Sequence, residues 1–262
     1  MKFDPRLIIT GGAFFFLSTL QAQMQQPALS NDTIPGKINR QPEVHHKHLL
    51  SPLLLPAMGI VYGFSGLHSD AIKDINEELQ EEVFIEHKHK QLHIDNYLQF
   101  SPGVAVYALN ALGIKGEHSF ADRSGIYLLS NVLLNVSCQS IKKASHSQRP
   151  DASTYASFPS GHTAEAFASA EFLRQEYKNV SPWYGVAGYA AAVSTGYLRM
   201  YNNRHWFSDV MAGAGIGILS TKFSYWLYPK LKNTLFKNHK EHALVMPSYN
   251  NGNIGLGLIK TF

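Results

Sequence analysis

The chain has 262 residues, of which 45% are hydrophobic and 16% charged, a composition typical of one domain with a large apolar core. Its net charge of +4 comes from scattered side chains without a Lys/Arg-rich tract, which argues against a nucleic-acid partner. Cys138 is the only cysteine, so the composition excludes an intramolecular disulfide and a thiolate metal cluster.

The N-terminal residues predict a secretory signal peptide over 1–22. Lys2 and Arg6 precede an apolar run, and Ala22 offers a small residue at a suitable cleavage point. An uncleaved anchor helix is the alternative, but an interrupted run of about fourteen residues is short for a membrane span. Residues 23–48 are polar and contain prolines without an apolar period, which predicts a linker.

The segment 49–240 is predicted to fold as an all-α bundle of about five or six core helices. Its first part, 49–67, is apolar but broken by two prolines, so it lies either in a membrane or against the core. Apolar residues at helical spacing among acidic ones predict an amphipathic surface helix over 70–83. The other predicted helices cover 97–114, 124–141, 163–177, 183–198 and 207–228. An Asn-Gly turn between two short apolar runs predicts a β-hairpin appendage within 241–262.

The pattern Arg199-x5-His205-x3-Asp209 brings three chemically active side chains to the start of the last predicted helix. If that helix begins at or just before His205, His205 and Asp209 share one helical face. The carboxylate can then hold the imidazole in one tautomer. Arg199 closes the preceding predicted helix and adds a cation beside the histidine.

Two upstream segments supply the remaining parts of an anion site. Ser160, Gly161 and His162 stand at the start of a predicted helix, where free N–H groups and the helix dipole favour an anion. Lys142 and Arg149 follow a long apolar helix and add two cations from its end. Each segment alone has a structural explanation, because cations favour helix C-termini and serine is an ordinary N-cap residue. Their conjunction favours a phosphate site.

The ordered set Lys-x6-Arg-Pro, Pro-Ser-Gly-His and Arg-x5-His-x3-Asp resembles the motifs of the type 2 phosphatidic acid phosphatase superfamily. This superfamily also contains bacterial non-specific acid phosphatases and vanadium haloperoxidases. The motifs span residues 142–209 in the order and spacing of the family. Leu198 departs from the pattern, since the family usually carries a serine there, but the departure removes no charge from the site.

The resemblance implies a role for each motif residue. His205 would attack phosphorus and form a phosphohistidine, while Asp209 fixes the other ring nitrogen. His162 would protonate the departing oxygen and then activate water. No metal or cofactor is needed, because cations and N–H groups of the protein hold the phosphate oxygens. The residues assigned to phosphate binding are Lys142, Arg149, Ser160, Gly161 and Arg199.

The predicted substrate is a lipid phosphate or a polyprenyl pyrophosphate, hydrolysed by an exported protein that is free in the periplasm or associated with the membrane. The apolar segment 49–67 favours a lipid. Polar residues inside the predicted helices and a mean hydropathy of −0.15 argue against a six-span membrane protein. A soluble periplasmic acid phosphatase for small phosphomonoesters is the close alternative. A vanadium haloperoxidase and a non-catalytic envelope protein that binds phosphorylated ligands are further alternatives.

Three other patterns are interpreted as structural. The glycine-rich run 213–217 favours close helix packing over nucleotide binding, because no predicted strand precedes it. Histidines within 45–48 and 87–93 are interpreted as solvated rather than metal-binding, since no fixed geometry supports a metal site. Three residues beside the motifs but off their spacing are interpreted as solvated neighbours: Lys143, His146 and Arg204.

Overall fold

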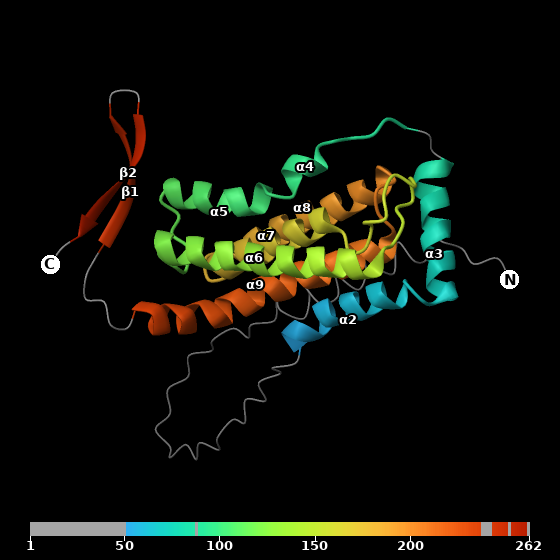
Figure 1. Cartoon of the computed structure of the whole chain (residues 1–262), viewed down its shortest axis with the longest axis horizontal. Coiled ribbons are helices and arrows are strands. Elements are labelled where there is room, and N and C mark those ends of the chain that lie inside the picture. Colours follow the sequence, from blue (N-terminus) through green and yellow to red (C-terminus); the bar gives the residue numbers. More distant parts are fainter. Residues whose placement is uncertain (1–50, 87–88, 237–242, 251–252, 261–262) are drawn as a thin grey trace, which may run out of the picture. The chain divides into compact units, whose positions relative to one another are not determined.

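The structure is a computed structural model that describes residues 51–86, 89–236, 243–250 and 253–260. Within these ranges the chain forms eight α-helices and one short π-helix, and the longest helices run along one another (Figure 1). The predicted signal peptide over 1–22 and the predicted linker over 23–48 lie outside the described residues.

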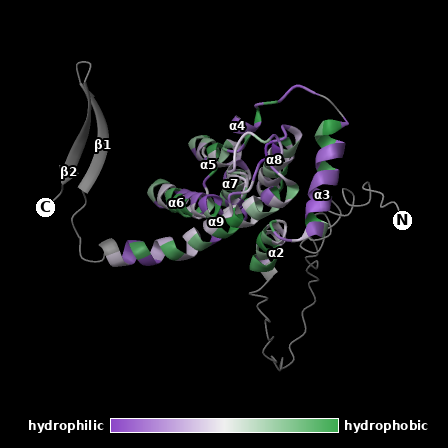
Figure 2. Cartoon of the chain, turned by 45° about the vertical axis from the view of Figure 1, so that its right-hand side comes forward, coloured by the Kyte–Doolittle hydropathy of each residue, from purple (hydrophilic) through white to green (hydrophobic). Residues whose placement is uncertain are grey.

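Helix α7 (Gly161–Tyr177) is the centre of the bundle. Every side chain from 163 to 173 is buried, because helices surround α7 on all sides (Figure 2). The surrounding helices are α5 (Ser101–Ala111), α6 (Phe120–Ser145), α8 (Pro182–Tyr201) and α9 (Phe207–Phe236). This arrangement confirms the predicted all-α helical bundle.

Three N-terminal helices complete the bundle: α2 (Ser51–Ser65), α3 (Asp70–Gln80) and α4 (Asp95–Leu98). Helix α2 packs along α9, and α3 continues into a π-helix over Glu81–Ile85. The buried Asn76 ties α3 to the start of α9, since its amide donates to Ser208 Oγ at 2.9 Å and accepts from Ser208 N at 3.0 Å.

The single helix predicted over 97–114 is wrong. The chain instead forms the four-residue α4 and then α5, with Pro102 in the first turn of α5. Proline is favourable in a first turn and unfavourable in a helix interior, so a new helix begins there. The break leaves α4 free to contact α7 and α8 on its own.

The glycines of 213–217 allow α9 to approach its neighbours at backbone distance. A Cβ added at Gly217 would collide with the backbone carbonyl of Ala164 on α7, and one at Gly215 would collide with that of Pro56 on α2. The packing interpretation of this run is therefore confirmed. No side chain fits at these crossings, so the helices interlock through backbone contacts.

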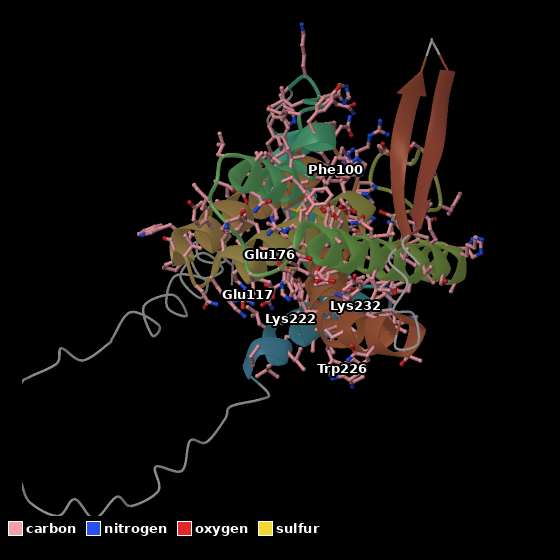
Figure 3. The ribbon with its side chains drawn as sticks, turned by 90° about the vertical axis from the view of Figure 1, so that its left-hand side faces the viewer. Phe100, Glu117, Glu176, Lys222, Trp226 and Lys232 are labelled. Atoms are coloured by element: carbon pink, nitrogen blue, oxygen red, sulfur yellow. The ribbon has the colours of Figure 1, made fainter. Side chains whose placement is uncertain are left out.

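Buried glutamates of α7 have cationic or hydrogen-bonding partners inside the bundle. Glu171 accepts hydrogen bonds from Arg174 at 2.7 Å and lies 2.9 Å from Lys222 Nζ. Glu176, labelled with Lys222 in Figure 3, accepts a hydrogen bond from Tyr225 at 2.7 Å. Among the helices that the structure describes, none is both long and apolar enough to cross a membrane.

In the C-terminal segment, β1 (Ala243–Asn250) and β2 (Asn253–Lys260) pair antiparallel where the sequence predicts the hairpin. Ala243 lies opposite Lys260, and Asn250 lies opposite Asn253. The predicted Asn-Gly turn at 251–252 lies outside the described residues.

Candidate active site

The C-terminal ends of α6 and α8 and the N-terminal ends of α7 and α9 meet at one end of the bundle (Figure 1). The three sequence motifs lie at these four ends. Helix ends present unpaired backbone groups and the partial charges of the helix dipole, so this junction suits a charged ligand.

Ser160 caps the N-terminus of α7. Its Oγ accepts a hydrogen bond from the backbone N–H of Thr163 at 3.4 Å, and its own N–H donates to the carbonyl of Asp209 at 3.0 Å. The second bond joins the start of α7 to the start of α9. A Cβ added at Gly161 would meet no atom within 4 Å, so space is open beside the first N–H groups of the helix. The predicted anion position is thus geometrically available.

His205 and Asp209 form the predicted i, i+4 pair, with His205 Nδ1 3.4 Å from Asp209 Oδ2. Both are buried, at 3% and 0% exposure. The same Oδ2 accepts hydrogen bonds from Ser157 Oγ at 2.5 Å and from the backbone N–H of Trp206 at 3.0 Å. The carboxylate is therefore fixed from two further segments, and with Nδ1 turned toward it the other ring nitrogen of His205 is left for chemistry.

Burial is the largest cause that lowers the pKa of His205, to about 4. The hydrogen bond and charge of Asp209 oppose this shift, while the cations Arg199 and Lys142 add to it. The imidazole is consequently neutral at neutral pH. A neutral imidazole has the lone pair that a nucleophile requires.

Lys142 extends from the last turn of α6 toward the loop that precedes α7. Its Nζ donates to the carbonyls of Ala156 at 2.7 Å and Ser157 at 3.1 Å. Burial, opposed by the charge of Asp209, lowers the pKa of Lys142 to about 8. This lysine is therefore charged at neutral pH and holds the loop that carries Ser157.

Helix α4 contributes two residues that the sequence motifs do not contain. Asp95, fully buried, accepts a hydrogen bond from Arg199 Nη1 at 2.5 Å. Its neighbour Asn96 has its Oδ1 2.9 Å from His162 Nε2. One short helix thus holds both the motif arginine of α8 and the motif histidine of α7.

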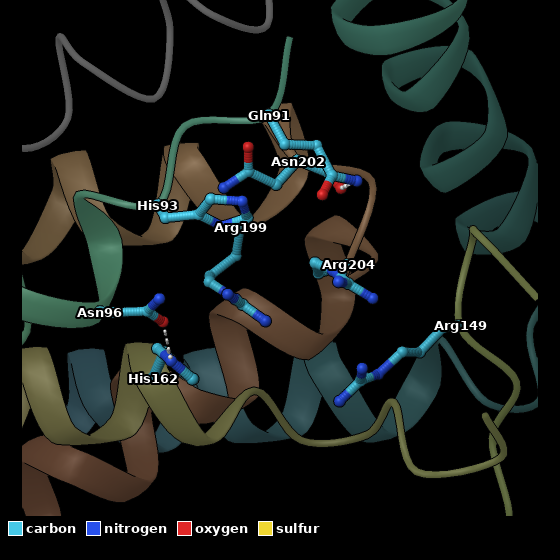
Figure 4. Close-up of a pocket in the computed structure, with 8 residues that line it drawn as sticks. All are labelled: Gln91, His93, Asn96, Arg149, His162, Arg199, Asn202 and Arg204. Atoms are coloured by element: carbon cyan, nitrogen blue, oxygen red, sulfur yellow. Dashed lines mark hydrogen bonds between the residues drawn. The ribbon is translucent and has the colours of Figure 1, made fainter. Parts of the chain in front are cut away.

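These elements enclose a pocket of about 250 Å³. Figure 4 shows three guanidinium groups that extend into this space from two segments, with His162 opposite Arg204. The lining residues are Gln91, His93, Asn96, Arg149, His162, Arg199, Asn202 and Arg204. None of these lining residues, all within the described part of the chain, is a carboxylate. A space lined by arginines, histidines and amides favours an anion.

The structure brings the predicted site residues to one place, in two layers. Arg149, His162 and Arg199 line the pocket. His205, Asp209 and Lys142 do not line it, yet Arg199 and Lys142 are close enough to His205 to lower its pKa. Burial, with the charge of Arg199 as the next cause, lowers the pKa of His162 to about 4. The two histidines and the cations therefore share one electrostatic environment.

The neighbouring residues differ in their surroundings. His93 is exposed and Arg204 is partly exposed, as predicted, and both also line the pocket. His89, also taken as solvated, stacks on the ring of Tyr201 at 3.4 Å between centroids and bonds to its carbonyl oxygen at 2.7 Å. The histidines at 45–48 and 87 lie outside the described residues. No group of three or more potential metal ligands occurs in the described ranges.

A second pocket of about 540 Å³ lies beside the site, between the C-terminal ends of α2 and α6 and the starts of α3 and α9. Asp209 is among its lining residues, so the pocket reaches the carboxylate that orients His205. The rest of the lining is mixed. Its largest apolar members are Phe64, Leu67, Ile141 and Trp206.

Comparison with known proteins places these motifs in a family. The sequence model of the PAP2 superfamily, the family of type 2 phosphatidic acid phosphatases, matches residues 124–233, which contain all three motifs. Residues 124–233 of the chain are therefore similar to the PAP2 superfamily. A relative that is 41% identical over 140 residues is the lipid A 1-phosphatase of Porphyromonas gingivalis, with the match covering 51% of this chain and 30% of the relative.

A second curated protein and two solved structures are also similar to this chain. The bacitracin transport permease protein BcrC of Bacillus licheniformis is 34% identical over 100 residues, which cover 37% of this chain and 47% of that protein. The chain thus matches about a third to a half of the length of these curated relatives. Among solved structures, one similar protein is a transmembrane PAP2 type phosphatidylglycerolphosphate phosphatase from Bacillus subtilis. Its sequence is 21% identical to this chain and its TM-score is 0.49, and the match covers 69% of this chain and 97% of that chain. Aquifex aeolicus LpxE has 24% identity, a TM-score of 0.45, and coverage of 58% and 95%.

Proposed function

We propose that this protein is a phosphatase that hydrolyses lipid phosphate monoesters or pyrophosphates through a phosphohistidine on His205. The observation that carries the proposal is a pocket lined by arginines, without a carboxylate among its described lining residues. One of these arginines, Arg199, acts electrostatically on the buried His205 of the His205–Asp209 pair. Two buried donors, Arg149 Nε and Arg199 Nε, have no hydrogen-bond partner among the described residues. Buried donors normally have partners, so both atoms fit a site that is completed by a phosphate.

In the first step, the free ring nitrogen of His205 attacks phosphorus in line with the leaving oxygen. A new N–P bond forms as the P–O bond breaks, and Asp209 stabilises the positive charge that develops on the imidazole. Lys142, Arg149 and Arg199 neutralise the phosphoryl oxygens, with the Ser160 hydroxyl and the first N–H groups of α7 as further donors. These protein cations perform the charge stabilisation that the reaction needs, so the proposal includes no metal.

In the second step, water attacks the phosphorus of the phosphohistidine, the N–P bond to His205 breaks, and His162 accepts the proton of the water. Burial lowers the pKa of His162 to about 4, so its ring is unprotonated at neutral pH and can accept this proton. Its acid role in the first step requires a higher pKa, and the negative charge of a bound phosphate shifts the pKa in that direction. Asn96 contacts His162 Nε2 and holds the orientation of the ring.

Three observations support a lipid substrate at a membrane surface. The lipid A 1-phosphatase relative is named for a lipid phosphate. Apolar lining of the second pocket lies next to Asp209. Large apolar side chains are also exposed on several helices, and Figure 3 labels two of them, Phe100 at 46% and Trp226 at 55% exposure. Exposed apolar stripes of this kind fit a membrane surface, here on the periplasmic side of the envelope. One stripe on α6 consists of Leu128, Val132 and Val136.

Phosphate release by the purified chain tests the proposal directly. The substrates are a polyprenyl pyrophosphate, a phosphatidic acid and a small soluble monoester, each with and without a chelator. We expect turnover of the lipids, no effect of the chelator, and loss of turnover in His205→Ala. Comparable turnover of the soluble monoester would instead indicate a broad periplasmic phosphatase. Unchanged turnover in His205→Ala contradicts the phosphohistidine mechanism.

A further inference from the structure

Arg204 is the one arginine of the pocket lining to which the mechanism above gives no role. It precedes His205 in the chain, lines the pocket together with Arg149 and Arg199, and extends into the same space in Figure 4. Its Nη1 donates to Asp151 Oδ2 at 2.8 Å. Arg204 is therefore held at the pocket by a single ion pair.

The two ion pairs of the pocket differ in burial. The side chains of Arg199 and Asp95 are 9% and 1% exposed, whereas those of Arg204 and Asp151 are 33% and 18% exposed. An ion pair in contact with water has a small net energy, so an incoming anion replaces Asp151 at Arg204 at little cost. Asp151 keeps a second contact in that case, because the backbone N–H of Ser153 donates to its Oδ1 at 3.0 Å.

The number of donors in the site exceeds what one phosphate uses. A transferred phosphoryl group spreads its charge over three equatorial oxygens. The groups assigned to those oxygens are Lys142, Arg149, Ser160, Gly161 N–H and Arg199. Arg204 is a surplus cation that faces the same space. A planar guanidinium suits bidentate binding of a further phosphoryl group.

We propose that Arg204 binds a second phosphoryl group, so that the preferred substrate of this site is an organic diphosphate rather than a monophosphate. This inference rests on the proposed function. The terminal phosphoryl group moves to His205 as its bond to the bridging oxygen breaks, and that oxygen leaves as part of a phosphate monoester bound at Arg204. Water then adds its oxygen to phosphorus as the bond between phosphorus and the His205 nitrogen breaks, and the proton of the water passes to His162. Inorganic phosphate is released, and His205 is again a free imidazole.

Two substitutions separate anion binding by Arg204 from support of the neighbouring loop. Arg204→Gln removes both the cation and the pair with Asp151, whereas Asp151→Asn removes the pair but keeps the cation. Lys143→Gln is the control for loss of one positive charge, because Lys143 is exposed at the end of α6 and outside the pocket lining.

The test compares kcat/KM for the diphosphate and the monophosphate of one polyprenyl alcohol. We expect Arg204→Gln to lower the diphosphate-to-monophosphate ratio by about tenfold to a hundredfold, the effect of losing a charged hydrogen bond. Asp151→Asn and Lys143→Gln keep the ratio within about threefold of the original. Equal losses on both substrates in Arg204→Gln overturn the proposal, and so does an equal fall of the ratio in Asp151→Asn.

Binding of methylenediphosphonate and inorganic phosphate, measured by calorimetry, tests the subsite without turnover. We expect Arg204→Gln to weaken diphosphonate binding by about tenfold or more and phosphate binding much less. Unchanged diphosphonate affinity overturns the subsite and leaves the phosphatase proposal standing. Retained turnover in His205→Ala refutes the phosphohistidine mechanism instead. It does not affect the conclusion on diphosphonate binding by Arg204, which calorimetry measures without turnover.

Discussion

Replacing Asp95 by alanine removes the carboxylate that neutralises Arg199 inside the bundle. The Asp95 side chain is 1% exposed, that of Arg199 is 9% exposed, and their atoms approach to 2.5 Å. Breaking a buried pair by removing one partner costs about 3–5 kcal/mol, because the remaining charge stays buried without compensation. We therefore expect Asp95→Ala to lower the free energy of unfolding by that amount.

Urea denaturation measures this loss, with Asp70→Ala as the matched control. Asp70 also forms an ion pair, with Lys73 at 3.1 Å, but the two side chains are 92% and 46% exposed. An exposed pair is worth less than about 1 kcal/mol, so the control separates burial from ion pairing as such. Inorganic phosphate is then added to both variants, because an anion in the pocket can replace the missing carboxylate beside Arg199.

We expect phosphate to stabilise Asp95→Ala more than it stabilises the original chain. A bound ligand at about a hundred times its Kd adds about 2.7 kcal/mol, which is enough to recover most of the loss. A loss in Asp95→Ala no larger than that in Asp70→Ala would refute the burial argument. A full loss with no response to phosphate would show that Arg199 does not face the anion site.

Three further predictions concern titration and packing. The free energy of unfolding falls as pH decreases from about 6.5 to about 4, because the unfolded chain protonates His162 and His205 at a higher pH than the folded chain does. Urea denaturation at about pH 7 and pH 5 measures this fall, which is smaller in His162→Gln, and equal stabilities contradict it. The KM for a phosphate ester rises above about pH 8 as Lys142 loses its proton, and Lys142→Arg moves this rise to higher pH. A pH profile of KM that the substitution leaves unchanged argues against a contact between Lys142 and the phosphate. Gly217→Ala lowers the free energy of unfolding by about 1–3 kcal/mol, because the added Cβ collides with α7. Gly161→Ala changes the free energy of unfolding by less than about 0.5 kcal/mol but lowers kcat/KM. Equal losses of stability in the two variants contradict the packing argument.

The sequence alone determined the local parts of the site. Helix ends are marked by residues close together in the sequence, so they can be predicted before the fold is known. Examples are Ser160 before α7, Lys142 at the end of α6, and the i, i+4 spacing of His205 and Asp209. Their conjunction gave the resemblance to the PAP2 superfamily, and the apolar runs at helical spacing predicted the helical bundle. The glycine run that spaces α9 from its neighbours is equally local, because small residues permit close crossings wherever helices meet.

Only the tertiary structure decided what surrounds those parts. Asp95 stands 104 positions before Arg199, on a four-residue helix too short to have a periodic pattern, so no local signal predicted their ion pair. Arg204 is off the motif spacing, but the turn after α8 bends back at Asn203, where φ is 57°, and brings Arg204 N to 3.0 Å from the carbonyl of Arg199. Contacts between distant segments depend on how whole helices pack, and that packing is a property of the assembled bundle rather than of any one stretch of sequence.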